Sequence, residues 1–327
     1  MVTGARGFIG SFLVESLLSK GVEVHCLLRD KKGGDGWLSG RNFVRVPGDV
    51  TDPDSLTSAM RGFDRIYHLA GCTKAIDQAE FQHTNVDGTK NLLEAVCKNN
   101  ADLKRFVLIS SLAAAGPSYD GQPLKESDPP KPVSNYGRSK LAAEQVALSF
   151  ADNIPLTIVR PPSVYGPRDT DVFTYFKYAT RGIRPVLSGG ERTASFAYVK
   201  DLAEGIILAA EKEASVGKTY YICDDTYYTW DELGTAIAEV LGVKTRRIVL
   251  PLFLAFVVAA AADLTARLVR RPSIINLDKY RELKMPHWIC SNEKAKIELD
   301  FSPKFELRRG LQETAEWYLK NGWIKIS

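Results

Sequence analysis

Three glycines stand at every third position near the start of the chain, at Gly4, Gly7 and Gly10. A short apolar stretch precedes them, and a helical pattern follows from Phe8 onward. Glycine permits a tight turn between a strand and a helix, and it lets an anionic group approach the backbone closely. The free amides at the start of the helix then face that group. The pattern predicts a strand-turn-helix unit that binds a pyrophosphate. The residues expected to contact it are Gly4, Arg6, Gly7, Phe8, Ile9 and Gly10.

The first half of the chain alternates short apolar runs with helical patterns, which predicts an α/β fold with a doubly wound parallel sheet of the Rossmann type. The expected strands are 22–28, 43–46, 65–69, 105–109, 156–159 and 218–223. The expected helices include 8–20, 81–99 and 135–150. With 327 residues the chain exceeds the usual size of one core. We therefore expect a dinucleotide-binding domain over 1–160 and a smaller substrate-binding lobe over 161–327, with segments such as 185–225 returning to the first domain.

Charge and composition exclude several classes of protein. The net charge of +4 arises from 43 basic and 39 acidic residues, which does not predict a nucleic-acid surface. Five cysteines without a C-x-x-C pair favour reduced thiols and a cytoplasmic setting. Four histidines lack the spacing of a metal site, so we expect no metal. No signal-peptide pattern opens the chain, and only three residues precede Gly4, so we expect the natural chain to begin further upstream.

The segment 248–262 is almost entirely apolar and has basic residues on both sides. It is shorter than the roughly 20 residues that a membrane-spanning helix needs, so no transmembrane span is expected. We favour a buried helix of the smaller lobe. A surface-lying membrane contact and a wall for an apolar substrate are the alternatives.

Further positions are expected at the ends of strands, where ligands bind in open α/β sheets. No acidic residue ends the second strand, and Arg29 follows it, with Arg6 near enough to help. Because a cation suits the 2′-phosphate of an adenosine ribose, NADP is favoured and NAD remains open. Asp49 and Val50 after the third strand are expected beside the adenine. After the fourth strand, small residues would let a cofactor lie close to the backbone at Leu69, Ala70 and Gly71.

Tyr136 and Lys140 lie four residues apart at the start of a helical pattern, so both side chains share one helix face. A phenol with pKa near ~10 can exchange protons at neutral pH only if positive charge favours its phenolate, and Lys140 provides such a charge. Ser110 and Ser111 follow the strand 105–109 and reach the same sheet edge. A hydroxyl there can hold a substrate oxygen, although serines at strand ends are also common helix caps. The predicted catalytic residues are Ser111, Tyr136 and Lys140.

Together the strings TGARGFIG, HLAG, NVDGT, ISS, YGRSK and RPPSVYGPRD resemble the extended short-chain dehydrogenase/reductase family, of the NAD-dependent epimerase/dehydratase type. The resemblance implies a Rossmann-type sheet, Tyr136 as general acid/base, Lys140 bonded to the nicotinamide ribose and Ser111 as third member. It also implies cofactor contacts by Ser110, Asn85, Pro161, Ser163 and Val164. A homodimer is common in such families, although no part of the sequence marks an interface.

Within this family the sequence is most similar to the 3β-hydroxysteroid dehydrogenase and dihydroflavonol reductase branch, and residues 272–317 are similar to members associated with sterols or hopanoids. Enzymes acting on nucleotide-sugars commonly carry a diphosphate-binding arginine where this chain has Ala194, and often an asparagine at Ser163. We therefore expect hydride transfer between NAD(P) and a secondary alcohol or ketone of a steroid-, terpenoid- or flavonoid-like substrate, with residues 251–262 lining its pocket. The alternatives are a nucleotide-sugar epimerase or dehydratase and a non-catalytic NADP-binding sensor or scaffold.

Overall fold

The structure is a computed structural model that describes residues 1–29, 34–269 and 276–326. Its larger part is a seven-stranded sheet in which every pair of neighbouring strands is parallel. The strand order is β10-β6-β5-β4-β1-β2-β3. The order reverses between β1 and β4, as in Rossmann folds, and ligands bind at such a reversal. The strands are β1 (Val2–Thr3), β2 (His25–Leu28), β3 (Val44–Pro47), β4 (Arg65–His68), β5 (Arg105–Ile109), β6 (Leu156–Arg160) and β10 (Lys218–Tyr221).

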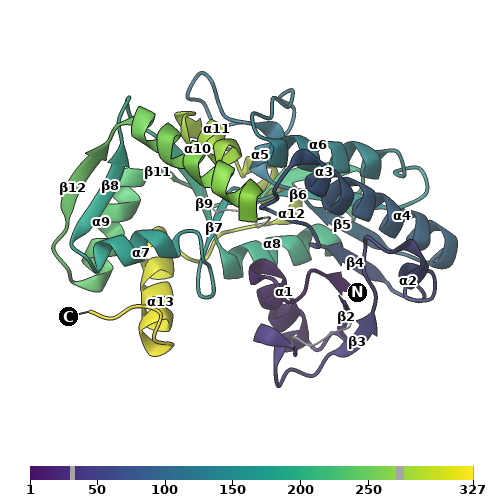
Figure 1. The fold of residues 1–327 in the computed structure, drawn as a ribbon. Helices are drawn as coiled ribbons and strands as arrows, with labels where there is room; N and C mark the ends of the chain where they lie inside the picture. Colours follow the sequence, from purple (N-terminus) through teal and green to yellow (C-terminus); the bar gives the residue numbers. More distant parts are fainter. Residues whose placement is uncertain (30–33, 270–275, 327) are drawn as a thin grey trace.

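Helices cover both faces of this sheet (Figure 1). On one face α1 (Phe8–Ser19) packs against α8 (Val199–Glu211), and on the other α4 (Gly88–Asn99) packs against α2 (Pro53–Thr57) and α6 (Asn135–Leu148). Two buried apolar clusters fill the spaces between the sheet and these two layers. The interior strand β5 is buried along its whole length, because helices cover both faces of the sheet. The predicted α/β class is confirmed.

The first part of the molecule also contains several shorter helical segments. They are η1 (Gly36–Leu38), α3 (Gln78–Phe81), the π-helix η2 (Gln82–Asp87), α5 (Leu112–Ala115) and η3 (Glu213–Ser215).

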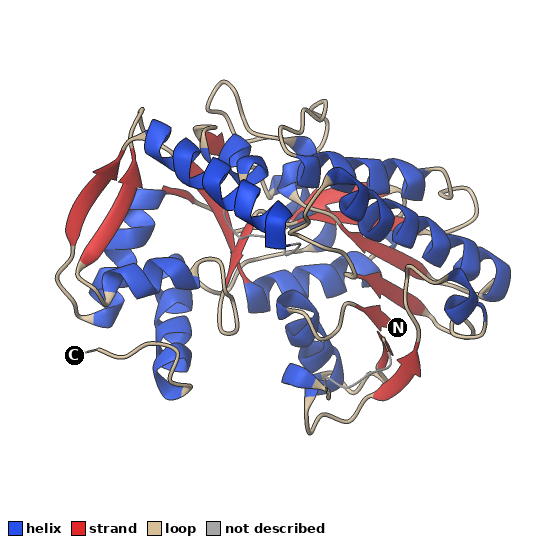
Figure 2. Ribbon diagram, in the orientation of Figure 1, coloured by secondary structure: helices blue, strands red, loops and turns tan. Residues whose placement is uncertain are grey.

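The remaining elements form a second part beside the first (Figure 2). Its central strand β9 (Thr193–Tyr198) pairs with β7 (Ser163–Tyr165), β11 (Tyr227–Thr229) and β13 (His287–Trp288). A separate two-stranded sheet joins β8 (Ile183–Leu187) to β12 (Arg246–Leu250). A third buried cluster, rich in aromatic residues, holds this part together. Its helices are α7 (Phe173–Ala179), α9 (Trp230–Leu241), α10 (Leu252–Val269), α11 (Leu277–Leu283) and α13 (Leu307–Lys320), whereas α12 (Glu293–Leu299) packs back on α8 and β10 of the first part.

Some of the later chain returns to the sheet of the first part, since α8 packs on β5 and β6 and β10 pairs with β6. The division of the chain near residue 160 stays a prediction.

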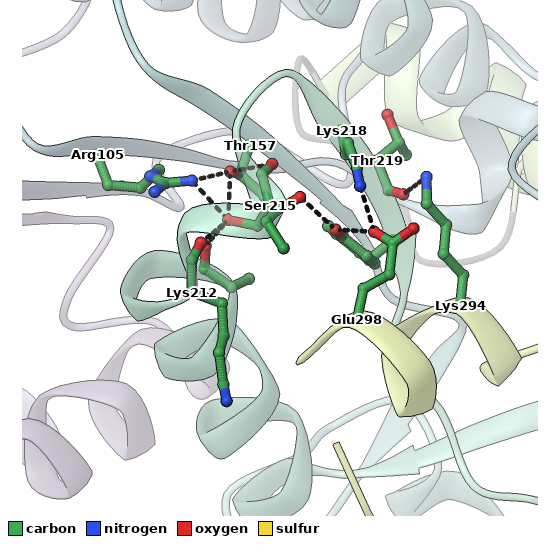
Figure 3. Close-up of polar contacts among 11 residues, drawn as sticks. Arg105, Thr157, Lys212, Ser215, Lys218, Thr219, Lys294 and Glu298 are labelled. Carbon is green, nitrogen blue, oxygen red and sulfur yellow. Dashed lines mark hydrogen bonds and ion pairs between the residues drawn. The ribbon is translucent and has the colours of Figure 1, made fainter. Parts of the chain in front are cut away.

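Polar side chains that bind one another form a cluster at the N-terminal ends of the main-sheet strands (Figure 3). Arg105 at the start of β5 is almost completely buried and donates to Thr157 Oγ1 at 3.2 Å and to Ser215 Oγ at 2.5 Å. Thr157 in turn donates to the carbonyl of Ser215. Close by, Glu298 binds the ammonium of Lys218 at 2.9 Å. Among the described residues the buried side chains of Arg105, Thr157 and Ser215 all have partners, so this cluster stabilises the fold.

The expected buried helix over 248–262 is wrong. In α10 only Ala259 is fully buried among the described side chains, whereas most of the large apolar side chains face solvent. The helix lies on the outside of the molecule because it packs mainly on the short helix α11 rather than on a sheet. Long apolar runs usually indicate core, and here the run is exposed. Among the described residues, no helix is long and apolar enough to cross a membrane.

Candidate active site

The glycine turn after β1 has the geometry that close packing requires. Gly4 has a φ of +68°, and a Cβ at this position would stand 2.7 Å from the backbone of Leu69 and Ala70. A Cβ on Gly10 would stand 2.3 Å from the carbonyl oxygen of Gly4. Helix α1 begins after Gly7, and within the described part of the chain no side chain caps its first amides. These amides are therefore open to an anionic ligand.

Cations stand near this turn. The Nε of Arg6 is buried and has no hydrogen-bond partner among the described residues. Arg29 directly follows β2 and is exposed. A buried guanidinium nitrogen without a partner is costly unless a ligand supplies one. The structure thus leaves Arg6 available to a bound anion beside the glycine turn.

The ends of β3 and β4 lie next to β1 and β2 in the sheet. Asp49 is held in a turn because its Oδ1 accepts from the amide and the hydroxyl of Thr51. Val50 is buried beside Gly88. The three residues that follow the last paired residue of β4 remain partly or fully accessible to solvent. They are Leu69, Ala70 and Gly71. These segments border the glycine turn, as the sequence predicts for a cofactor groove.

A buried histidine that the sequence analysis left without a role fixes the geometry between β1 and β4. The Nδ1 of His68 lies 2.8 Å from Thr3 Oγ1, and its Nε2 lies 3.0 Å from Thr89 Oγ1. Thr3 Oγ1 also accepts from the amide of Ala70 at 3.1 Å. Burial lowers the pKa of His68 to about 3, so the ring is neutral and acts as a structural link.

Asn85 joins two parts of the site. Its Oδ1 accepts from the amide of Cys72 at 2.8 Å, and its Nδ2 donates to the carbonyl of Cys72 and, at 2.9 Å, to Ser139 Oγ. It stands in the π-helix η2, a rare conformation that is frequent at functional sites. Asn85 therefore holds the loop after Gly71 against helix α6.

Helix α6 brings Tyr136 and Lys140 to the sheet edge at which the strands end. Ser134 begins the helix, since its hydroxyl accepts from the amide of Gly137 at 2.9 Å. The Nζ of Lys140 is buried and donates to the carbonyl of Ile109, the last residue of β5, at 2.7 Å. Burial lowers the pKa of Lys140 to about 8, and the carboxylate of Glu144 offsets part of this shift. The ammonium is thus fixed beside the end of β5.

Ser111 lies within hydrogen-bonding reach of the Tyr136 phenol. Burial raises the pKa of Tyr136 above its ordinary value, whereas the bond to Ser111 lowers it and the charge of Glu282 raises it further. Ser111 also caps α5, because its Oγ accepts from the amide of Ala113 at 3.1 Å. The capping role and the contact with Tyr136 therefore coexist. The neighbouring Ser110 is buried, and its hydroxyl has no partner among the described residues.

The segment after β6 closes the other side. Pro161 accepts from the amide of Leu112 at 2.8 Å. Ser163 and Val164 belong to β7 and pair with β9. Val164 packs against the same small cluster as Phe8 and Ile9 at the start of α1. The structure thus brings the segment after β6 next to the glycine turn.

Two sets of residues at this site were missed by the sequence analysis. Glu144, one turn after Lys140, accepts two hydrogen bonds from Arg160, at 2.9 and 2.6 Å, and both side chains are buried. At the start of α6, Asp278 of α11 accepts from the amide of Asn135 at 2.6 Å and from that of Tyr136 at 3.1 Å. Glu144 carries a weak signal, because it falls on the same helix face as Lys140. Asp278 carries none, since it is 142 residues away from Tyr136.

The position relevant to nucleotide-sugars lies on β9. Ala194 is completely buried. Arg192, two residues earlier, is also nearly buried, and its Nη2 donates to the carbonyl of Ser188 at 3.2 Å while its Nε has no partner among the described residues. The sequence analysis noted the loss of arginine at 194 and overlooked the arginine beside it.

Two cavities border this region. One of about 160 Å³ lies between α3, the start of α6 and the α10–α11 pair, where Phe81, Asn135, Asp263 and Asp278 line it. Another of about 400 Å³ lies beyond β10 and is lined by Ser195, Asp224 and Cys290 among others. Residues 251–262, expected to line the substrate pocket, line neither of these cavities. The described residues contain no group of three or more metal-ligating side chains.

Taken together, the turn, the open helix start and the residues around Tyr136 fit a dinucleotide, whose pyrophosphate the start of α1 would hold and beside whose nicotinamide Tyr136 and Lys140 would stand. The unpartnered Arg6 Nε and Ser110 Oγ are observations that such a ligand explains. A parallel doubly wound sheet with this site defines a dinucleotide-dependent enzyme fold.

The chain belongs to the NAD dependent epimerase/dehydratase family, whose model matches residues 1–223. It is 34% identical to ceramide reductase of Caulobacter vibrioides over 324 residues, which cover 99% of this chain and 95% of that protein. It is 30% identical to the human sterol-4-alpha-carboxylate 3-dehydrogenase, decarboxylating, over 68% of this chain and 61% of that protein. The predicted family, its reductase and dehydrogenase branch and the assignment as an enzyme are confirmed.

A solved structure supports the fold over the whole chain. UDP-glucose 4-epimerase of Thermotoga maritima, determined with UDP-glucose, matches with a TM-score of 0.79 at 25% identity, covering 98% of each chain. Relatives of this chain therefore include reductases, dehydrogenases and epimerases. All of them fall within one family of nicotinamide-dependent enzymes.

Proposed function

We propose that this protein is an NADP(H)-dependent reductase acting on the ketone of a long-chain lipid, of the kind that an oxidised ceramide carries. The assembly of Ser111, Tyr136 and Lys140 beside the open start of α1 is the observation that carries this proposal. The name of the Caulobacter relative supports the lipid class, because the similarity extends over almost all of both chains.

The chain's own groups perform the proton transfer. A bound nicotinamide supplies the hydride that the carbonyl carbon receives. Tyr136 donates its phenolic proton to the carbonyl oxygen, which becomes the hydroxyl of a secondary alcohol. Ser111 holds that oxygen by a hydrogen bond, and Lys140 stabilises the phenolate left on Tyr136.

Two features favour an apolar substrate over a nucleotide-sugar. Ala194 cannot bind a diphosphate, and it lies in a completely buried position. The helix beside the site, α10, exposes phenylalanine, leucine and valine rather than polar residues. A substrate with long hydrocarbon chains suits this surrounding better than a dianionic one.

An epimerase acting on a nucleotide-sugar is the second candidate, and Arg192 is the observation that favours it. Its buried, partly unpaired guanidinium stands two residues from the usual diphosphate-binding position. The likeness to UDP-glucose 4-epimerase supports the same candidate.

One experiment separates the two candidates. The protein is mixed either with NADPH and an N-acyl 3-keto long-chain base in detergent micelles or with NAD⁺ and UDP-glucose, and both products are analysed by mass spectrometry. The proposal predicts stoichiometric loss of NADPH absorbance with formation of the lipid alcohol, and no change in UDP-glucose. Epimerised sugar without net cofactor oxidation, together with an unchanged lipid, would contradict it. If UDP-glucose is epimerised after all, Arg192→Ala should abolish that reaction and leave reduction of the lipid unchanged.

The remaining parts of the assignment are proposals of finer detail. NADP is favoured over NAD because Arg29 stands exposed after β2 and the Nε of Arg6, in the glycine turn, has no partner among the described residues. The five cysteines are all free, which supports a reducing, cytoplasmic setting. A homodimer and a contact of residues 248–262 with a membrane surface also stay proposals.

A further inference from the structure

The outer surface of the molecule is unusually apolar in one segment. Nine of the nineteen large apolar side chains that are exposed among the described residues lie within 248–269, which we call the apolar arm. They come from the end of β12 and from α10, and Phe253 is the most exposed of them at 70%. Contiguous exposed apolar surface on a folded protein marks an interaction site. The nine residues are Ile248, Val249, Phe253, Leu254, Phe256, Val257, Val258, Leu264 and Val269.

Basic residues flank the arm at both ends. Between 244 and 271 the sequence contains Lys244, Arg246, Arg247, Arg267, Arg270 and Arg271, and its single acidic residue is Asp263. This net charge of +5 exceeds the +4 of the whole chain, so the rest of the protein is close to neutral. Lys244 and Arg246 are exposed and form no ion pair within the described part of the chain. A partner that covers the arm must therefore be apolar in its interior and anionic at its surface.

The arm lies next to the candidate active site. The ring of Phe256 contacts that of Tyr280 on α11, with centroids 5.4 Å apart. On the other side of α11, Asp278 binds the amides of Asn135 and Tyr136. Asp263 of α10 lines the cavity of about 160 Å³ that reaches the start of α6. A surface that covers α10 would therefore lie close to this cavity, since α10 packs against α11 (Figure 1).

A second copy of the chain is a poorer occupant than a lipid surface. In a twofold interface the same patch faces itself, so the basic ends of two arms would approach one another. Like charges brought together in this way oppose association. An anionic bilayer instead offers negative headgroups to the basic ends and hydrocarbon to the phenylalanines between them.

We propose that the apolar arm docks on the surface of an anionic lipid bilayer. Helix α10 lies in the plane of the interface. Its 18 residues are too few to cross the bilayer, and side chains at both of its ends are exposed. Docking brings α11, whose Asp278 accepts a hydrogen bond from the amide of Tyr136, close to the membrane surface. The docking itself rests on the arm alone and does not depend on the proposed reductase activity.

Vesicle flotation without substrate or cofactor tests the proposal. The full chain is mixed with vesicles of phosphatidylcholine alone, or of phosphatidylcholine and phosphatidylglycerol in equal parts, and floated through a density gradient. The variants are Phe253→Ser with Phe256→Ser, and Lys244→Glu with Arg246→Glu. The matched control is Ile297→Ser, which removes an equally exposed apolar side chain from α12. Circular dichroism establishes that each variant is folded.

The wild type and the control are expected to float with the anionic vesicles. The phenylalanine variant should bind them roughly tenfold more weakly or worse, because it loses two aromatic side chains from the interface. The charge-reversed variant should lose the preference for anionic over neutral vesicles. Absence of the wild type from the floated fraction, or unchanged binding of the phenylalanine variant, would overturn the proposal. So would a dimer in light scattering that the phenylalanine variant dissociates, since the occupant would then be a second copy.

Discussion

At one edge of the seven-stranded sheet, formed by the N-terminal ends of its strands, the buried polar side chains have hydrogen-bond partners among the described residues. At the opposite edge, formed by the C-terminal ends of the strands, several buried polar side chains have no partner among these residues. Arg105 binds Thr157 and Ser215 at the first edge. At the second edge, Ser110 Oγ and both oxygens of Asp224 have no partner among the described residues. A buried polar group without a partner costs free energy. The comparison teaches that the first edge stabilises the fold and that the second is left open for ligands.

The largest effect on this comparison is expected from Lys140→Met. Its ammonium favours the phenolate of Tyr136, so we expect the rate of NADPH-dependent reduction to fall at least ~100-fold. Stability should hardly change at neutral pH, because within the described residues the buried ammonium makes a single hydrogen bond, to the Ile109 carbonyl. Steady-state kinetics and thermal unfolding measure the two quantities. Lys131→Met, at an exposed position, is the control. A Lys140→Met protein that is clearly less stable but retains the wild-type rate of reduction would contradict this assignment of the second edge.

Arg105→Met should give the opposite result. It leaves Thr157 and Ser215 without their charged donor, so the free energy of unfolding should fall by about 2 to 3 kcal/mol. The catalytic rate of the folded fraction should stay the same, since the residue lies at the far edge of the sheet. Urea titration of this variant and of Lys104→Met, an exposed neighbour, provides the measurement. Equal stability of the two variants would show that the buried cluster is not a stabilising one.

A smaller effect is expected at the cofactor. Arg29→Ser removes a cation that would bind the 2′-phosphate, so the affinity for NADPH should fall about tenfold and that for NADH should not. Fluorescence titration with each nucleotide measures both values. Arg138→Ser, an exposed arginine on α6, is the control. An equal loss for NADPH and NADH would assign Arg29 to the fold or to the shared part of the cofactor.

The smallest effect concerns the pH dependence of stability at Asp224. Burial, with help from the charge of Asp201, raises the pKa of this carboxyl from 3.8 to about 8 in the folded chain. The folded state therefore binds more protons than the unfolded state between these values, and stability falls as the pH rises from about 4 to about 8. Asp224→Asn should lack this loss. Because Asp224 borders the cavity of about 400 Å³, solvent screens much of the effect, and we expect about 1 kcal/mol.

Urea titrations of the wild type and of Asp224→Asn at several pH values test this prediction. Asp225→Asn, at an exposed position, is the control. The difference between the wild type and Asp224→Asn should grow in favour of the variant with rising pH. A constant difference would show that Asp224 is not a raised carboxyl.

The sequence predicts the main sheet well because its signals are local. The expected strand 105–109 coincides with β5, and the expected helix 135–150 differs from α6 only at its end. Runs of apolar residues with glycine and serine at their ends carry this information. The second sheet was not predicted, because β13 pairs with β9 across more than 90 residues and each strand is short.

The candidate site divides in the same way. Ser111, Tyr136 and Lys140 come together because α6 packs beside the end of β5, and the strand and helix patterns of the sequence are sufficient to group them. Asp278 meets the start of α6 only because two helices fold back over the site, and no spacing indicates that contact. The position of the apolar run 248–262 depends on the same fold-back. Hydrophobicity alone therefore predicted burial where the structure has an exposed surface.

The central claim is that Tyr136 transfers a proton to a ketone beside a bound nicotinamide. The most direct measurement is the single-turnover rate of ketolipid reduction by Tyr136→Phe saturated with NADPH, with Tyr119→Phe as the exposed control. The account predicts that the Tyr136 variant binds NADPH like the wild type and reduces the ketone ~100- to 10,000-fold more slowly. A Tyr136→Phe enzyme that binds NADPH and turns over at the wild-type rate would contradict it.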